Sequence, residues 1–94
     1  MITWEAMSPE LETLDQLLGG DLSLSILIRV YPNDGAFTKA IHGLLMAGDV
    51  RLKTVEDNDV PQRRWRELFL EGTVLSDLAA FKLSITQKGV AKIG

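Results

Sequence analysis

The first periodic segment of the chain is an amphipathic helix near the N-terminus. Ser8 is a suitable N-cap, and Pro9 follows at the first helical position, where proline is favoured. The apolar residues beyond it recur at the three- and four-residue spacing of one helix face: Leu11, Leu14, Leu17 and Leu18. Gly19-Gly20 then ends the pattern. These features predict a helix over about Pro9 to Leu18.

The segment Asp21–Tyr31 is compatible with two structures. Apolar residues occupy every second position from Leu22 to Val30, which is typical of a strand. Asp21 is also a suitable helix cap, and most of the same residues form a helical face once Leu27 is included. The local pattern favours a strand, whereas the elements on both sides favour a helix. We predict a helix.

The clearest helical pattern lies in Ala36–Ala47, after a loop indicated by Pro32-Asn33-Asp34-Gly35. Gly48 stands where glycine commonly ends a helix. The apolar face of this predicted helix holds Phe37, Ala40, Ile41, Leu44 and Leu45. The opposite face, which is expected to be exposed, holds Thr38, Lys39, His42, Gly43 and Met46.

Two strands are predicted in the second half of the chain. Val50–Val55 and Phe81–Ile85 both alternate apolar with polar residues, and the polar turn Glu56–Asp59 ends the first of them. After the second strand, the residues from Val90 to Ile93 form a short terminal helix that is weakened by Gly89.

The stretch between these strands contains another predicted helix. Pro61 lies in its first turn, and Gly72 ends it. Its buried face is expected to hold Trp65, Leu68 and Phe69. Residues 76–80 are long enough for one further turn before the second strand begins.

Two stretches resemble a known family, the winged helix-turn-helix domains. Ala36–Leu52, which reads AFTKAIHGLLMAGDVRL, is similar to the third helix and first wing strand of that family. Phe81–Val90, which reads FKLSITQKGV, is similar to the second wing strand and its frequent Leu-Thr-x-x-Gly ending. The likeness covers roughly residues 21–93. It implies an α+β, winged-helix-like fold with three N-terminal helices, a small antiparallel β-sheet and an inserted helix.

The chain departs from DNA-binding winged helices in two ways. Their wing is usually a tight hairpin with basic residues near its tip, whereas about 25 residues separate the two strands here. The turn after the first strand is Glu56-Asp57-Asn58-Asp59, whose carboxylates would repel phosphates. The chain looks more like small bacterial proteins that keep this scaffold around an inserted helix.

Length and composition indicate one globular domain. Ninety-four residues are enough for one domain and too few for two, so residues 1–94 are expected to form a single unit with residues 1–8 as a candidate flexible end. Trp4 and Met7 are expected either to pack back onto the core or to form an interface. Cysteine is absent, which excludes disulfides and thiolate metal sites.

The same features indicate a cytoplasmic protein. The first residues have neither the basic start nor the apolar stretch of a signal peptide. The longest apolar run, Ile26-Leu27-Ile28, is far too short to span a bilayer. No membrane partner is therefore expected.

Charge is unevenly distributed along the chain. The net charge is −3, but residues 1–35 carry −5, because six acids face only Arg29. Residues 36–94 carry +2, from nine basic and seven acidic residues. Phosphate contacts supply most non-specific affinity for nucleic acid, so a binder usually shows a basic domain or stripe. The acidic total counts against nucleic-acid binding, and the mildly basic second part favours it.

Candidate contact residues fall into three groups. Lys39 and His42 lie on the exposed face of Ala36–Ala47, but that face lacks the Arg, Asn and Gln side chains that read bases. The only dense basic cluster is Arg63-Arg64-Trp65-Arg66, whose arginines could hold phosphates or an acidic protein surface. The first strand adds two further basic residues to this set, Arg51 and Lys53.

An ordinary structural interpretation of these residues stays open. On a helix, Trp65 would belong to the core, the arginines would line the solvated side, and Glu67 would pair with Arg63 four residues earlier. Likewise, the outer face of Ala36–Ala47 could be a solvated helix surface, and His42 a surface residue without a role.

No catalytic, cofactor or metal site can be assembled from recognisable motifs. His42 is the only histidine, so without cysteine a zinc site would depend on carboxylates. No phosphate-binding loop with Gly-Lys-Ser/Thr is present. We therefore predict that the protein is not an enzyme, has no cofactor and has no identifiable small-molecule ligand.

The favoured function is a binding module that acts through a protein partner or as a homodimer. The alternative is a winged-helix DNA-binding transcriptional regulator.

Overall fold

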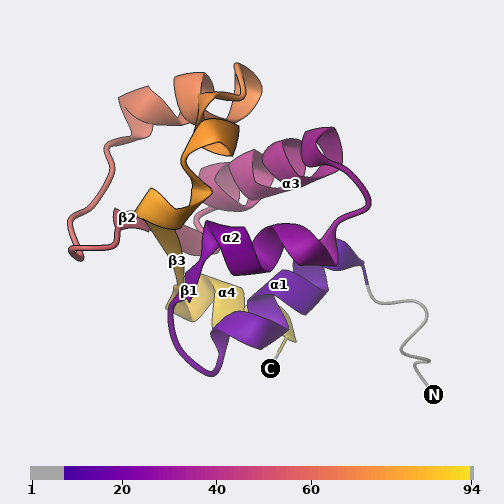
Figure 1. Ribbon diagram of the computed structural model, residues 1–94. Coiled ribbons are helices and arrows are strands. Elements are labelled where there is room, and N and C mark those ends of the chain that lie inside the picture. Colours follow the sequence, from indigo (N-terminus) through magenta and orange to yellow (C-terminus); the bar gives the residue numbers. More distant parts are fainter. Residues whose placement is uncertain (1–7, 94) are drawn as a thin grey trace.

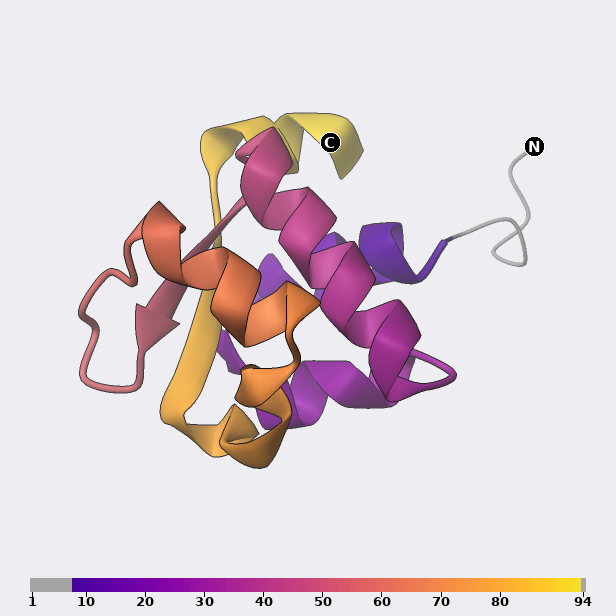
Figure 2. The same cartoon turned by 90° about the horizontal axis from the view of Figure 1, so that it is seen from above.

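A three-stranded antiparallel sheet carries helices on one face in the computed structural model, which describes residues 8–93 (Figures 1 and 2). The strands are β1 (Leu22–Ser23), β2 (Val50–Thr54) and β3 (Phe81–Ile85), with β3 in the middle. The chain therefore has an α+β fold. The expectations for Trp4 and Met7 lie outside the described residues.

The two long strands are confirmed, and their alternation sorts apolar from polar side chains. Leu52 of β2 pairs with Leu83 of β3, and both are buried beneath the helices. Arg51 and Lys53 alternate with Leu52 along β2, so their side chains lie on the outer face of the sheet. Val55, the last residue of the predicted first strand, lies just beyond the end of β2.

The first predicted helix is confirmed as α1 (Pro9–Leu17). The hydroxyl of Ser8 accepts a hydrogen bond from the backbone N–H of Leu11 at 3.3 Å, as an N-cap should. The side chains that α1 buries are Thr13, Leu14 and Leu17. Leu18 is the C-cap and is 52% exposed, so the fourth leucine of the predicted stripe faces outward.

The ambiguous second segment contains both of the structures that its pattern allows. β1 takes only Leu22–Ser23, and α2 (Leu24–Leu27) and the 3₁₀-helix η2 (Ile28–Val30) follow directly. The helix prediction is thus confirmed for residues 24–30 and wrong for Leu22 and Ser23. The strand ends because the Ser23 hydroxyl caps α2, accepting a hydrogen bond from the backbone N–H of Ser25 at 3.2 Å.

The third helix, α3 (Asp34–Ala47), begins two residues earlier than predicted. The side-chain oxygen of Asn33 accepts a hydrogen bond from the backbone N–H of Ala36 at 2.8 Å. Because Asn33 is the cap, Asp34 and Gly35 belong to the helix and not to the predicted loop. Gly48 ends α3 with a left-handed φ of 81°. Of the predicted apolar face, Ala40 is half-buried and the other four side chains are buried: Phe37, Ile41, Leu44 and Leu45.

The outer face of α3 differs from the prediction at Thr38. This residue is buried, and its hydroxyl donates a hydrogen bond to the carbonyl of Gly35 at 3.2 Å. A hydroxyl that bonds back to the preceding turn needs no water, so threonine can lie beside the core. The other four residues stay at the surface: His42 is half-buried, and Lys39, Gly43 and Met46 are exposed.

The chain between β2 and β3, residues 55–80, is here called the insert. It folds as short helical turns instead of one α-helix: η3 (Gln62–Arg64), η4 (Arg66–Leu70), η5 (Thr73–Ser76) and η6 (Leu78–Ala80). Three of these are 3₁₀-helices, whereas η4 is a π-helix, which packs against α3 (Figure 1).

Trp65 packs against the core as predicted, but it is buried less completely than its two predicted partners. The backbone N–H of Glu71 donates to the carbonyl of Arg66 at 3.0 Å, five residues earlier, so this turn is wider than an α-helical one. In this wider turn, residues three apart are less closely aligned than in an α-helix. Leu68 and Phe69 are buried as predicted, but Trp65 is only half-buried.

The C-terminal helix, α4 (Gln87–Ile93), is longer than predicted and packs on α1 and β3. The hydroxyl of Thr86 accepts a hydrogen bond from the backbone N–H of Gly89 at 3.1 Å, which supports the first turn. Gly89 itself is buried. The glycine expected to weaken this helix therefore lies at its contact with the rest of the fold.

A buried polar pair joins α1 to the end of η2. The hydroxyls of Thr13 and Tyr31 lie 2.8 Å apart, and the ring of Tyr31 packs edge-on against Phe37 with centroids 5.5 Å apart. Burial raises the pKa of Tyr31 to about 12, and the nearby carboxylates of Glu10 and Glu12 act in the same direction. The Thr13 hydrogen bond opposes this shift without cancelling it.

The Tyr31 phenol is expected to titrate near pH 12 in the folded protein. Its unfolded pKa is about 10, so the folded state holds the proton more tightly. The stabilisation that comes with this proton is complete below about pH 10 and is lost as the pH rises toward 12. Tyr31 is the only tyrosine, so ultraviolet absorbance of the phenolate reports it directly. A midpoint near 10 in folded protein would contradict the prediction, and Tyr31→Phe should abolish the absorbance change.

Candidate functional site

The outer face of the sheet carries lysines whose charges are balanced by aspartates. Lys53 and Lys82 stand directly opposite each other in the β2–β3 register, where like charges repel. Asp57 Oδ1 lies 3.4 Å from Nζ of Lys53 and 3.1 Å from Nζ of Lys82. Asp21 adds a second partner for Lys82 at 3.3 Å. Lys53, a predicted contact residue, is therefore engaged within the fold.

The acidic turn after β2 thus has a structural function. Asp57 adopts a left-handed φ of 73°, which aspartate tolerates better than most residues. Hydrogen bonds from Lys82 and then Lys53 lower the pKa of the Asp57 carboxyl. The hydrogen bond to Asp57 in turn raises the pKa of the Lys82 ammonium. Both shifts favour the charged forms of Asp57 and Lys82, and these ion pairs largely neutralise this face of the sheet.

A groove between α3 and the insert brings several candidate residues together. Its volume is about 540 Å³, and its walls include His42, Met46, Arg63, Trp65, Arg66 and Leu70. The first two belong to α3, and the others belong to the insert. We call this surface the α3–insert groove.

Apolar side chains from both walls are exposed in this groove. Met46 and Leu70 are each 56% exposed, and Trp65 is half-buried between the groove and the core. The side-chain amide of Gln62 donates a hydrogen bond to Met46 Sδ at 3.7 Å, which links the insert to α3. The indole N–H of Trp65 donates to the carbonyl of Val60 at 3.2 Å, so its polar atom is satisfied within the insert.

The arginines of the groove keep their charges accessible. Arg63 and Arg66 are exposed, and neither takes part in an ion pair formed within residues 8–93. The predicted pair of Arg63 with Glu67 is not formed. Such a pair depends on four-residue α-helical spacing, which the 3₁₀ and π turns do not supply. The groove therefore combines apolar side chains with two exposed positive charges.

The remaining candidate residues lie apart from this groove. Lys39 faces a different hollow on the other side of α3, together with Lys92. Arg51 lies on β2 beside a pocket at the sheet edge. Arg64 is exposed on η3 and is not part of the groove wall. Of the predicted contact residues, the fold thus brings together only His42, Arg63 and Arg66.

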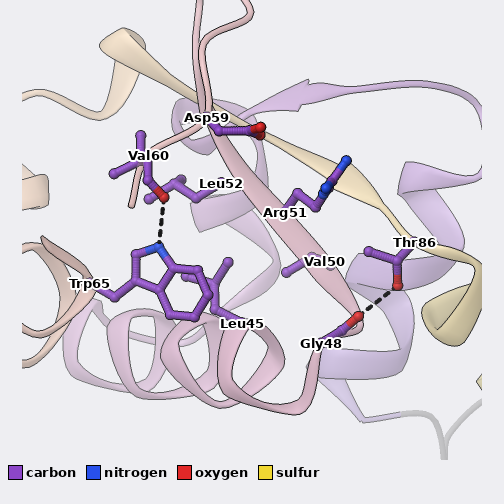
Figure 3. Close-up of a pocket in the computed structure, with 9 residues that line it drawn as sticks. All are labelled: Leu45, Gly48, Val50, Arg51, Leu52, Asp59, Val60, Trp65 and Thr86. Carbon is purple, nitrogen blue, oxygen red and sulfur yellow. Dashed lines mark hydrogen bonds between the residues drawn. The ribbon is translucent and has the colours of Figure 1, made fainter. Parts of the chain in front are cut away.

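The pocket at the edge of β2 is smaller, about 280 Å³, and is shown in Figure 3. Its apolar residues are Leu45, Val50, Leu52, Val60 and Trp65. The insert closes part of this edge, because the backbone N–H of Val60 donates to the carbonyl of Leu52 at 3.0 Å. Trp65 lines both this pocket and the α3–insert groove, so one side chain borders the two hollows.

A buried carboxylate lies where α3 meets α4. Asp49 is fully buried, and its Oδ2 accepts a hydrogen bond from Nζ of Lys92 at 2.6 Å. Its Oδ1 has no hydrogen-bond partner among the described residues. The ion pair fastens the last turn of α4 to the strand end after Gly48, which is a structural contact within the fold.

Two properties of residues 8–93 bear on the classes of function considered. Within this range no group of three or more His, Cys, Asp or Glu side chains could hold a metal ion. No helix of the same range is long and apolar enough to cross a membrane. Comparison with protein-family models, with curated proteins and with solved structures found no match for this chain.

Sequence reasoning missed part of the groove. Leu70 and Gln62 were not identified as surface contact residues, although both lie beside the basic cluster in sequence. Successive residues of a helical turn point in different directions, so the residue after the buried pair Leu68–Phe69 is a candidate for the surface, and this pattern could have indicated Leu70.

Proposed function

We propose that the chain is a non-catalytic protein-binding module on a winged-helix-like scaffold, and that it binds its partner in the α3–insert groove. The observation that carries this proposal is the groove itself. Two large exposed apolar side chains, Met46 and Leu70, lie on its opposite walls beside Arg63 and Arg66. Single exposed apolar residues are ordinary on a protein surface, but a group in one hollow is typical of a binding site.

The composition of the groove suits protein recognition. Tryptophan, methionine and arginine are enriched where proteins bind one another, and Trp65, Met46 and two arginines meet here. A groove between two helical elements accepts an amphipathic helix, whose apolar side chains enter the hollow. With a basic rim, the best partner is a helix that also carries acidic side chains.

The winged-helix-like scaffold is supported by the order of the elements. Three helical segments precede β2, and β3 lies between β1 and β2 in an antiparallel sheet. The insert occupies the place of a wing tip and packs on α3, the helix that would read DNA in that family. As a result, the insert lies beside the outer side of α3, and His42 and Met46 on that side line the groove between them.

DNA binding is the second candidate function. It is favoured by the exposed arginines of the insert, Arg63, Arg64 and Arg66, which form no ion pair within residues 8–93. One observation argues against DNA binding. A recognition helix must enter a major groove about 12 Å wide. The insert packs beside α3 and would hinder that entry. The lysines of the sheet are also balanced by Asp21 and Asp57.

Titration with a synthetic amphipathic helix of leucine and glutamate residues is expected to perturb the groove. In ¹H–¹⁵N spectra the shifts should concentrate at His42, Met46, Leu70 and the indole N–H of Trp65. Leu70→Glu should weaken binding at least tenfold, about 1.4 kcal/mol, because it places a carboxylate against the acidic probe. Ile26→Glu is the matched control, since Ile26 is also an exposed apolar residue but lies on α2.

Two results would contradict the proposal. One is the absence of any localised shift with the peptide. The other is binding of random-sequence duplex DNA at about 50 mM salt with an affinity that falls steeply as salt rises, which is the behaviour of a protein that contacts phosphates.

A further inference from the structure

We infer that the α3–insert groove receives the α1 surface of a second copy of this chain, so that copies associate head to tail. This inference rests on the proposed function, because it identifies the partner of the same groove. It follows from three features: the charge of the groove, the charge and shape of α1, and the positions of the two surfaces on the molecule.

The outer surface of α1 has the chemistry that the groove requires. Glu12, Asp15 and Leu18 follow one another at three-residue spacing and therefore lie on one side of the helix. All three are exposed, with Leu18 at 52%. Neither carboxylate forms an ion pair within residues 8–93. This side of α1 is an acidic helix surface with an apolar side chain at its end.

The two surfaces are complementary in charge and in apolar content. Arg63 and Arg66 offer two positive charges to the two carboxylates of α1, and Leu18 can enter the hollow between Met46 and Leu70. The same asymmetry extends over the chain, since residues 1–35 carry −5 and residues 36–94 carry +2. Each copy therefore contains both halves of the interface.

The two surfaces lie on opposite sides of the molecule. Figures 1 and 2 show α1 at the side remote from the insert, with α3 between them. One copy thus cannot satisfy its own groove with its own α1. A contact between different patches of two copies is heterologous and leaves one free patch at each end, so further copies can add. The average mass in solution should rise continuously with concentration instead of reaching a plateau at a dimer.

Sedimentation equilibrium of charge-reversed variants tests this arrangement. In the first variant, Arg63→Glu and Arg66→Glu make the groove acidic. In the second, Glu12→Lys and Asp15→Lys make α1 basic. Each variant alone should have an association constant at least tenfold below that of the original chain, because its two surfaces now repel. An equimolar mixture should associate again, because each acidic surface then meets a basic one.

A matched control reverses basic residues elsewhere. Arg29→Glu with Lys88→Glu changes the net charge by the same amount as the groove variant, at two exposed positions outside both surfaces. This control should associate like the original chain. All the substituted side chains are exposed, so circular dichroism should show folded protein in every case.

Three outcomes would overturn the inference: a strictly monomeric original chain at roughly 1 mM, a plateau at the mass of a dimer, or association that the two variants and their mixture leave unchanged. The peptide titration separates this failure from that of the proposed function. If the acidic peptide shifts the groove and the chain stays monomeric, the groove binds a different protein. If the peptide does not bind, the proposed function itself is wrong.

Discussion

Gly89→Ala is expected to destabilise the protein by about 3 kcal/mol, because α4 lies against backbone at this position. A Cβ at residue 89 would be 2.3 Å from the carbonyl oxygen of Asp49 and 2.9 Å from Cγ1 of Ile85. The carbonyl cannot easily move, since it accepts a hydrogen bond from the backbone N–H of Thr86 at 3.0 Å. Relief therefore requires α4 to shift away from the sheet, which would also strain the ion pair between Lys92 and the buried carboxylate of Asp49.

The same substitution at Gly43 is the matched control. Gly43 lies in the middle of α3, and an added Cβ there would meet nothing within 4 Å. Alanine is a better helix former than glycine, so Gly43→Ala should stabilise the protein by about 0.5–1 kcal/mol. Urea unfolding measures both changes. Equal effects of the two substitutions would contradict the close contact between α4 and Asp49.

Periodicity predicted those elements whose packing follows from their own residues. α1 has a cap, a leucine stripe and a glycine stop, and it was placed within one residue of its observed end. β3 alternates without interruption and was placed at its observed bounds. In α3 the four inward side chains were identified, because an apolar face of this width has only one way to be buried.

The errors arose where a side chain bonds to the backbone or where the helix type changes. The amide of Asn33 and the hydroxyl of Ser23 decide where α3 and α2 begin, and both also suit a loop or a strand. The hydroxyl of Thr38 finds a carbonyl in the preceding turn and is buried. In the insert, a π-helix follows Trp65, which is only half-buried against the core, and α-helical spacing gives no indication of this.

The candidate site could be predicted only in part for a related reason. Arg63 and Arg66 were identified because they belong to one basic cluster in the sequence, and His42 because it lies on the exposed face of α3. Their meeting in one groove depends on how η4 packs on α3, which is a tertiary contact. Lys53 was predicted as a contact residue because it is basic. In the fold, the left-handed turn at Asp57 brings the Asp57 carboxylate next to the Lys53 ammonium, so Lys53 is paired within the chain.

Phe69→Ala is expected to cost about 3–5 kcal/mol, the largest single effect predicted for this chain. The ring is 1% exposed and belongs to the same apolar cluster as the inward residues of α3, so its removal leaves a cavity in the main core. Domains of this size have only about 5–15 kcal/mol of stability, and the variant should be largely unfolded in modest urea.

The adjacent residue provides the control for Phe69→Ala, and the pair tests whether the groove is a fixed surface. Leu70 is 56% exposed, so Leu70→Ala should change the free energy of unfolding by less than about 0.5 kcal/mol while weakening binding in the groove. The insert then forms one wall of the groove on the exposed side of η4 and part of the core on its buried side. If Phe69→Ala were tolerated as well as Leu70→Ala, the insert would not contribute to the stability of the core. The groove that it forms with α3 would then have no rigid wall to hold Arg63 and Arg66 in place.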